Sequence, residues 1–172
     1  MRQTTPAVKG LITGFLMILA LLLSFYILKN PIESNFQLIV YGIYTAGIGW
    51  SLYDHYKLPG SSKGFKDFFS AGFKTFVIVV LLMSLYTFVF FSYNTGFRDD
   101  KIAENSKMLV IQGNHLPNEI EENAKKLKDM FMPLMISSAV FRYLIIGAMI
   151  TAIAGGFLSN KAKTAVQDRT RV

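Results

Sequence analysis

Four long stretches of the chain contain no charged residue, and more polar segments separate them. The stretches are Gly10 to Leu28, Phe36 to Tyr53, Thr75 to Tyr93 and Tyr143 to Asn160, with 19, 18, 19 and 18 residues. At about 1.5 Å per residue, a helix of this length crosses the roughly 30 Å hydrocarbon core of a bilayer. A soluble protein of this size has no room to bury four such helices. The pattern therefore predicts an all-α membrane protein, a four-transmembrane-helix bundle.

We expect a single membrane domain over residues 1–172. Its spans cover about 10–28, 36–53, 70–93 and 133–158, an external helical segment covers about 99–131, and a basic tail covers 159–172.

The segment between the third and fourth spans is expected to form two helices. Asp99 or Asp100 is the expected cap of the first, and Gly113 is its expected stop. Asn118 with Glu121 forms a capping-box pattern for the second.

The second of these helices carries an apolar stripe, formed by Ile120, Ala124, Leu127 and Phe131. Glu–Lys pairs at i, i+4 lie beside it, and Pro133 is expected to separate it from the fourth span. The two helices are predicted to form an amphipathic hairpin outside the membrane. The stripe is interpreted as structural, with Ile120 and Leu127 as a partner-docking alternative.

The formal net charge of +7 is distributed unevenly. The N-terminus, the second loop and the C-terminal tail carry about +2, +2 and +3, whereas the first and third loops carry about 0 and −1. The positive-inside rule then predicts a multi-pass protein of the bacterial cytoplasmic (inner) membrane with both termini cytoplasmic. Because the cations are split among short flanks, nucleic-acid binding is not expected. Membrane lipids are the expected partners of these flanks.

Small residues recur at four-residue spacing in three of the spans. Such ridges allow close helix packing in lipid, either within one chain or in a homo-oligomer. The predicted packing residues are Gly10 and Gly14 in the first span, Gly42 and Ala46 in the second, and Gly147, Thr151 and Gly155 in the fourth.

Aromatic residues are concentrated just before the third span. Phe65, Phe69 and Phe73 follow each other at i, i+4, with Lys66 and Lys74 nearby. The segment is interpreted as an interfacial lead-in to the span, and the alternative is a docking face for a cytoplasmic partner.

No catalytic, cofactor or metal-binding motif is present, and the chain has no cysteine. The histidines, His55 and His115, are expected on opposite sides of the membrane, so no shared metal site and no cofactor are predicted. Arg142 is the one ionisable residue within an apolar run. It lies about 26 Å of helix from Ser159, so it is expected to reach the outer interface and anchor there or bind lipid phosphate. The alternative is a role in substrate binding.

The order of these features resembles a family of small bacterial membrane proteins, domain of unknown function 4199. The matching motifs are the glycine-led first span GLITGFLMI, a short second span ending in basic residues, the F-x-x-x-F-x-x-G-F-K pattern from Phe65 to Lys74, the charged external helix, and a fourth span opening at FMPLM. They cover nearly the whole chain, although Arg142 is not part of the family pattern. The resemblance implies four helices and a membrane location, and it brings no activity.

Two classes of function remain. The first is a non-enzymatic membrane subunit or scaffold, assisting an envelope-biogenesis complex through a protein partner. The second is a small oligomeric transporter or lipid-handling membrane protein. An enzyme is not expected, because no positioned acid, base or nucleophile is recognisable.

Overall fold

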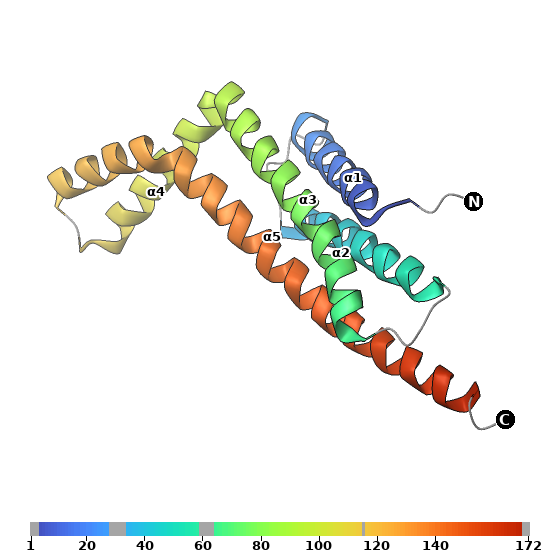
Figure 1. The fold of residues 1–172 in the computed structure, drawn as a ribbon. Helices are drawn as coiled ribbons and strands as arrows, with labels where there is room; N and C mark the ends of the chain where they lie inside the picture. The colour runs from blue at the N-terminus through green and yellow to red at the C-terminus, as the bar shows by residue number, and fades with distance from the viewer. Residues whose placement is uncertain (1–3, 28–33, 59–63, 115, 170–172) are drawn as a thin grey trace. The chain divides into compact units, whose positions relative to one another are not determined.

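In this computed structural model, residues 4–27, 34–58, 64–114 and 116–169 are described. Every regular element in these ranges is an α-helix, which confirms the predicted all-helical class (Figure 1). The helices are α1 (Pro6–Tyr26), α2 (Ser34–Lys57), α3 (Phe65–Tyr93), α4 (Thr95–Gln112) and α5 (Pro117–Arg169).

Three of the five helices, α1, α3 and α5, are long and apolar enough to cross a membrane. The 24 residues of α2 give it a sufficient length, but tyrosine, serine, threonine and glycine make it less apolar than the other three. The sequence and the structure together therefore indicate a membrane protein.

The chain divides into two compact units. The first comprises Met1–Met83 and Phe141–Val172, and the second comprises Ser84–Val140. The first unit thus contains α1, α2, most of α3 and the C-terminal part of α5.

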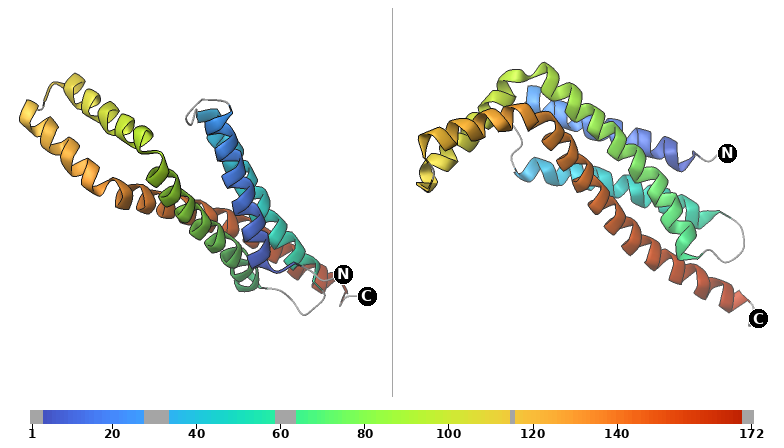
Figure 2. Two further views of the ribbon diagram at one scale, coloured as in Figure 1. Left: turned by 90° about the horizontal axis from the view of Figure 1, so that it is seen from above. Right: turned by 60° about the vertical axis from the view of Figure 1, so that its left-hand side comes forward.

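In the first unit, α1 and α2 run in opposite directions. Lys9 near the start of α1 lies against Asp54 near the end of α2. Thr13, one turn later in α1, lies against Gly47, two turns earlier in α2. Figures 1 and 2 show the two helices side by side.

The pairing of α3 with α5 is also antiparallel. Phe76 lies against Gly147, and Phe68, two turns earlier in α3, lies against Gly155, two turns later in α5. The start of α1, the end of α2, the start of α3 and the end of α5 therefore lie at one end of the first unit, which is called the shared end below (Figure 1).

Each helix of the first unit contributes to its core. In α3 the buried residues follow a spacing of three and four, as expected for one helix face. The fully buried large side chains of the unit are Met17, Tyr44, Ile48, Leu52, Phe68, Phe76, Val79 and Met83.

In the second unit, aromatic contacts join α3, α4 and α5. The ring of Phe91 lies 5.1 Å from that of Phe131, centroid to centroid, and 6.1 Å from that of Phe97. Phe131 is buried, and so is Ile102 of α4 in the same unit. Figure 2 shows α4 next to the N-terminal part of α5.

The ends of α4 differ in part from the sequence prediction. Gly113 ends the helix in the left-handed conformation, with φ of 70°, which confirms the predicted stop. The prediction that Asp99 or Asp100 caps the helix is wrong, because α4 begins one turn earlier at Thr95. The Asn94 amide instead donates a hydrogen bond to the Phe90 carbonyl, so the chain passes directly from α3 into α4.

The start of α5 is also set by a different residue from the one predicted. The Leu116 amide donates to the Glu119 carboxylate over 3.0 Å, so Glu119 rather than Glu121 closes the first turn. The helix begins at Pro117, where a missing amide proton costs no helical hydrogen bond.

The prediction of a break at Pro133 is wrong, since α5 is one helix of 53 residues. Proline removes only one helical hydrogen bond, and membrane helices often tolerate this loss. The buried side chains Phe131 and Ala139 hold the helix on both sides of Pro133. The basic tail likewise continues α5 through Arg169.

The aromatic lead-in to the third span is part of α3 itself. The Asp67 carboxylate accepts a hydrogen bond from the Gly64 amide over 3.0 Å and fixes the start of the helix. Phe65 is therefore the first residue of a helix of 29 residues.

Candidate functional site

The shared end of the first unit contains a buried ion pair that sequence reasoning missed. Lys9 Nζ lies 2.6 Å from Asp54 Oδ2, and the two side chains are 3% and 28% exposed. The same ammonium group lies 5.5 Å from the centre of the Trp50 ring, within range of a cation–π interaction. Lys9 thus has its charge compensated on two sides by α2.

Hydrogen bonds between helices continue this polar region. The Thr75 hydroxyl lies 2.7 Å from that of Ser51 and 3.2 Å from the Pro6 carbonyl, so one threonine of α3 contacts both α1 and α2. Ser51 and Thr75 are fully buried. We call Lys9, Ser51, Asp54 and Thr75 the polar cluster.

The polar cluster was missed because its charges stand at the borders of apolar runs. Lys9 directly precedes the first run, and Asp54 directly follows the second. A charge count treats both as residues that flank a span. The helices extend beyond the charge-free runs, so both residues belong to helices and face one another.

The predicted ridge on α5 lies inside the first unit. A Cβ atom at Gly147 would collide with Tyr44 and Phe76, and one at Gly155 would lie 3.3 Å from Phe68 Cβ. Thr151 is fully buried between them.

The glycines of α1 also allow close contact. A Cβ atom at Gly10 would lie 2.6 Å from the Thr75 carbonyl oxygen, and one at Gly14 would lie 2.6 Å from Leu82 Cδ1. Both glycines are buried in the interface with α3.

The glycine–alanine pair of α2 behaves differently. Gly42 and Ala46 are exposed, and a Cβ atom at Gly42 would meet nothing within 4 Å. The close contact of α2 instead uses Gly47, where a Cβ atom would collide with Thr13. The predicted face was wrong for packing within the chain, because Val40, Tyr44 and Ile48 turn the opposite face inward.

A second close approach that the prediction missed lies between α3 and α5. A Cβ atom at Gly72 would collide with the side chain of Thr151. Tyr44 adds a polar link to α5, because its hydroxyl donates to the Tyr143 carbonyl over 2.8 Å.

Arg142 is exposed on α5 within the first unit. It stands next to Tyr143, whose side chain is buried against Tyr44 with ring centres 5.7 Å apart. The arginine therefore points away from the packed face of the helix.

The three predicted docking phenylalanines form a ladder on α3. Ring centres are 5.7 Å apart between Phe65 and Phe69, and 6.4 Å apart between Phe69 and Phe73. Phe65 and Phe73 are 46% and 47% exposed, whereas Phe68 is buried against α5.

In the second unit, Ile120 and Leu127 are half-buried, like Ala124 between them, whereas Phe131 is buried. Glu122 and Lys126 form the expected surface ion pair, with 2.7 Å between charged atoms. The stripe therefore faces the interior of this unit over most of its length.

Four large apolar residues are exposed within a stretch of nine residues around the turn between α4 and α5. Met108, Val110, Ile111 and Leu116 are 52%, 61%, 83% and 67% exposed. We call these four residues the apolar tip. Periodicity reasoning passed over them because they belong to no stripe of a single helix.

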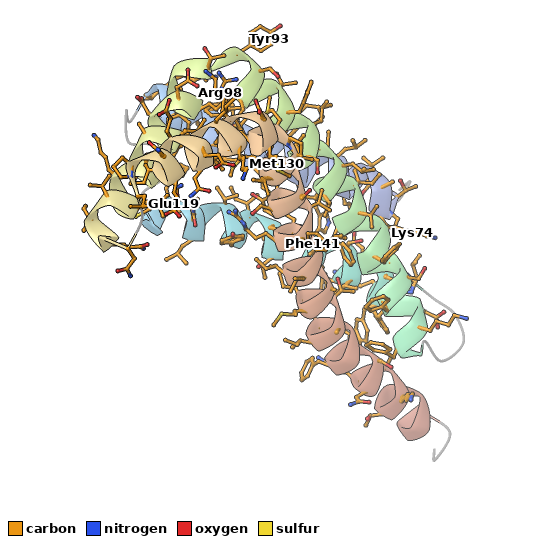
Figure 3. All side chains as sticks on the ribbon, turned by 90° about the vertical axis from the view of Figure 1, so that its left-hand side faces the viewer. Lys74, Tyr93, Arg98, Glu119, Met130 and Phe141 are labelled. Carbon is orange, nitrogen blue, oxygen red and sulfur yellow. The ribbon has the colours of Figure 1, made fainter. Side chains whose placement is uncertain are left out.

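No group of three or more His, Cys, Asp or Glu side chains comes together among the described residues. His55 lies against the Phe68 ring, 5.3 Å between centres, and His115 is outside the described residues. Asp99 is paired with Arg98 at 3.0 Å (Arg98 is labelled in Figure 3).

The comparisons with known proteins bear on nearly the whole chain. A family model described as protein of unknown function (DUF4199) matches residues 9–160. No curated protein and no solved structure matches the chain. The family match includes the polar cluster, the ridge of α5 and the apolar tip. The chain belongs to the DUF4199 family of proteins of unknown function.

Proposed function

We propose that the protein is a non-enzymatic subunit or scaffold of the bacterial cytoplasmic membrane that assists an envelope-biogenesis complex. In this proposal α1, α2, α3 and α5 each cross the membrane once. Both termini are cytoplasmic, and α4 forms an extracytoplasmic amphipathic hairpin with the first part of α5.

The arrangement of the first unit supports this topology. Its shared end holds the helix ends that adjoin, in the sequence, the N-terminal flank, the second loop and the C-terminal tail, the three segments with a positive net charge. The positive-inside rule assigns such an end to the cytoplasm.

Packing supports α2 as the fourth span despite its lower hydropathy. Its buried face extends from Val40 to Leu52 and lies against α1 at Thr13 and against α5 at Tyr143. A helix that other spans cover in this way needs less apolar surface of its own than one surrounded by lipid.

The apolar tip is the observation that carries the scaffold role. Its four large apolar side chains are more than half exposed, although they lie at least fifteen residues beyond the apolar run of α3. Clustered apolar residues on a segment outside the membrane usually mark an interaction site. We assign this site to a protein partner in the extracytoplasmic space.

Site-specific photo-crosslinking tests the assignment. A crosslinking amino acid at Ile111 should give one discrete protein adduct in intact cells, and the same group at the exposed Asp100 should not. Adducts with lipid alone, or equal labelling at both positions, would contradict a protein-binding tip. An adduct with a second copy of this chain would identify the partner as a homo-oligomer.

The polar cluster favours a second candidate, a small oligomeric transporter or lipid-handling protein. Ionisable groups buried among membrane helices often line transport pathways. Proteoliposomes that contain the pure protein should then show transport of a solute or a lipid across the bilayer, and Asp54→Asn should abolish it. The scaffold proposal expects no such transport.

A further inference from the structure

The first three turns of α3 present an unusual combination of side chains. Phe65, Lys66, Phe69, Phe73 and Lys74 lie on or beside the exposed side of the helix. We call these five residues the aromatic–lysine face. Lys74 is labelled in Figure 3.

The register between α1 and α3 places this face at the level of lipid head groups. Gly10 lies against Thr75 and Ile78, and Gly14 lies against Leu82, so the two helices run in parallel and their charge-free runs begin at the same level. The charge-free run from Thr75 to Tyr93 accounts for about 28 Å of helix, nearly the whole hydrocarbon core. The ten residues before it add about 15 Å, so they cross the interfacial region, which is about 5 to 8 Å deep on each side, and reach the aqueous side of the head groups.

At the shared end of the first unit, lysines outnumber acidic residues. The described side chains of the first unit include six lysines but only two acids, Asp54 and Asp67. Asp54 is paired with Lys9, and Asp67 accepts the hydrogen bond from the Gly64 amide. Among the described residues, neither Lys66 nor Lys74 has an ion-pair partner.

We propose that the aromatic–lysine face binds the head group of an anionic phospholipid. Lys66 and Lys74 are about 12 Å apart along the helix, and the ring ladder lies between and beside them. The ammonium groups attract the lipid phosphate, and the exposed edge of Phe73, the ring nearest the hydrocarbon core, contacts the glycerol and the first acyl carbons.

Two features favour a lipid over a protein at this surface. The two cations flank the rings of Phe69 and Phe73 along the membrane normal, so the charged and apolar parts of one lipid meet matching groups. The face also belongs to a helix that is itself apolar enough to cross the membrane, which places lipid beside it directly. The inference needs only α3 to lie in the membrane, so it does not depend on the scaffold role or on the apolar tip.

Native mass spectrometry on the full chain in mild detergent tests the proposal. Phosphatidylglycerol and phosphatidylcholine with identical acyl chains are the probes. The wild-type protein should retain phosphatidylglycerol preferentially, and Lys66→Gln/Lys74→Gln should weaken its binding roughly 10- to 30-fold. The control Lys125→Gln/Lys128→Gln removes two exposed lysines of the second unit and should leave the binding unchanged.

Further variants show whether a loss of lipid binding is caused by the lost positive charge or by a defect in folding. Lys66→Arg/Lys74→Arg should retain the preference, because either cation attracts phosphate. Phe69→Leu should weaken binding of both lipids to a similar degree. Equal retention of the two lipids by the wild-type protein would overturn the proposal, and so would an equal loss in the second-unit control. These outcomes leave the crosslinking result at Ile111 unaffected.

Discussion

Lys9 Nζ lies 2.6 Å from Asp54 Oδ2, and the lysine side chain is almost fully buried while the aspartate side chain is 28% exposed. Because of this difference in exposure, removing one partner should cost more stability than removing the other. Removing the aspartate leaves a buried cation, whereas removing the lysine leaves a carboxylate that still reaches solvent.

We therefore expect Asp54→Asn to destabilise the protein by about 3 kcal/mol, and Lys9→Gln to cost less. The measurement is thermal unfolding of both variants in the same detergent. The double variant should be more stable than Asp54→Asn alone, because no unpaired charge remains. Equal losses in the two single variants would show that burial does not distinguish the partners.

The glycines of α2 provide a matched pair for packing. Gly47→Ala should destabilise the protein by about 1–3 kcal/mol, because its Cβ atom would collide with Thr13. Gly42→Ala should be neutral or slightly stabilising, since alanine is a better helix former and nothing lies within 4 Å. Thermal unfolding compares them directly. A larger loss at Gly42 would indicate that another chain covers this face.

The sequence predicted the helices better than their contacts. Charge-free runs located α1, α2, α3 and the C-terminal part of α5, because hydropathy depends on residue type alone. The contacts of α2 depend on which face turns inward, and Gly42 and Gly47 are both small. Only the three-dimensional packing of Tyr44 and Ile48 selects Gly47.

The ion pair between Lys9 and Asp54 illustrates a second limit of prediction from the sequence. Lys9 and Asp54 are 45 positions apart, and each is typical of a residue flanking a membrane span. Their partnership requires antiparallel packing of α1 and α2 in one register. A charge count predicts the side of the membrane but not the partner of each charge.

The next prediction concerns the depth of the Arg142 side chain in the membrane. Arg142→Lys should preserve membrane levels and assembly, because both side chains can extend to the interface. Arg142→Glu should lower them, since a carboxylate there would meet anionic head groups. Quantitative immunoblots of membrane fractions measure the levels, and native gels measure assembly. A lysine variant as defective as the glutamate variant would favour a specific guanidinium contact.

Surface ion pairs give the second unit a small dependence on pH. The hydrogen bond from Lys101, and then its charge, lower the pKa of Glu104 below the usual value. Glu122 is affected in the same way by Lys126. A lowered pKa means that the pairs stabilise the fold above the unfolded-state value, and that this contribution is lost as pH falls through the folded-state value.

We therefore expect Glu104→Gln/Glu122→Gln to reduce stability slightly at pH 7 and to have no effect at pH 3. Because both carboxylates are exposed, the difference should also disappear in high salt. Thermal unfolding at the two pH values, with and without added salt, measures it. A difference that persists at pH 3 would have another cause.

Topology is the central claim, and single-cysteine labelling tests it most directly because the chain has no native cysteine. Cysteines at the exposed positions Thr4, Leu58, Asn114 and Lys163 should be treated in intact cells with a membrane-impermeant maleimide. Four spans predict that only the Asn114→Cys variant is labelled before the membrane is permeabilised. If α2 does not cross, Leu58→Cys and Lys163→Cys would be labelled outside while Asn114→Cys is protected, and the four-span account would be contradicted.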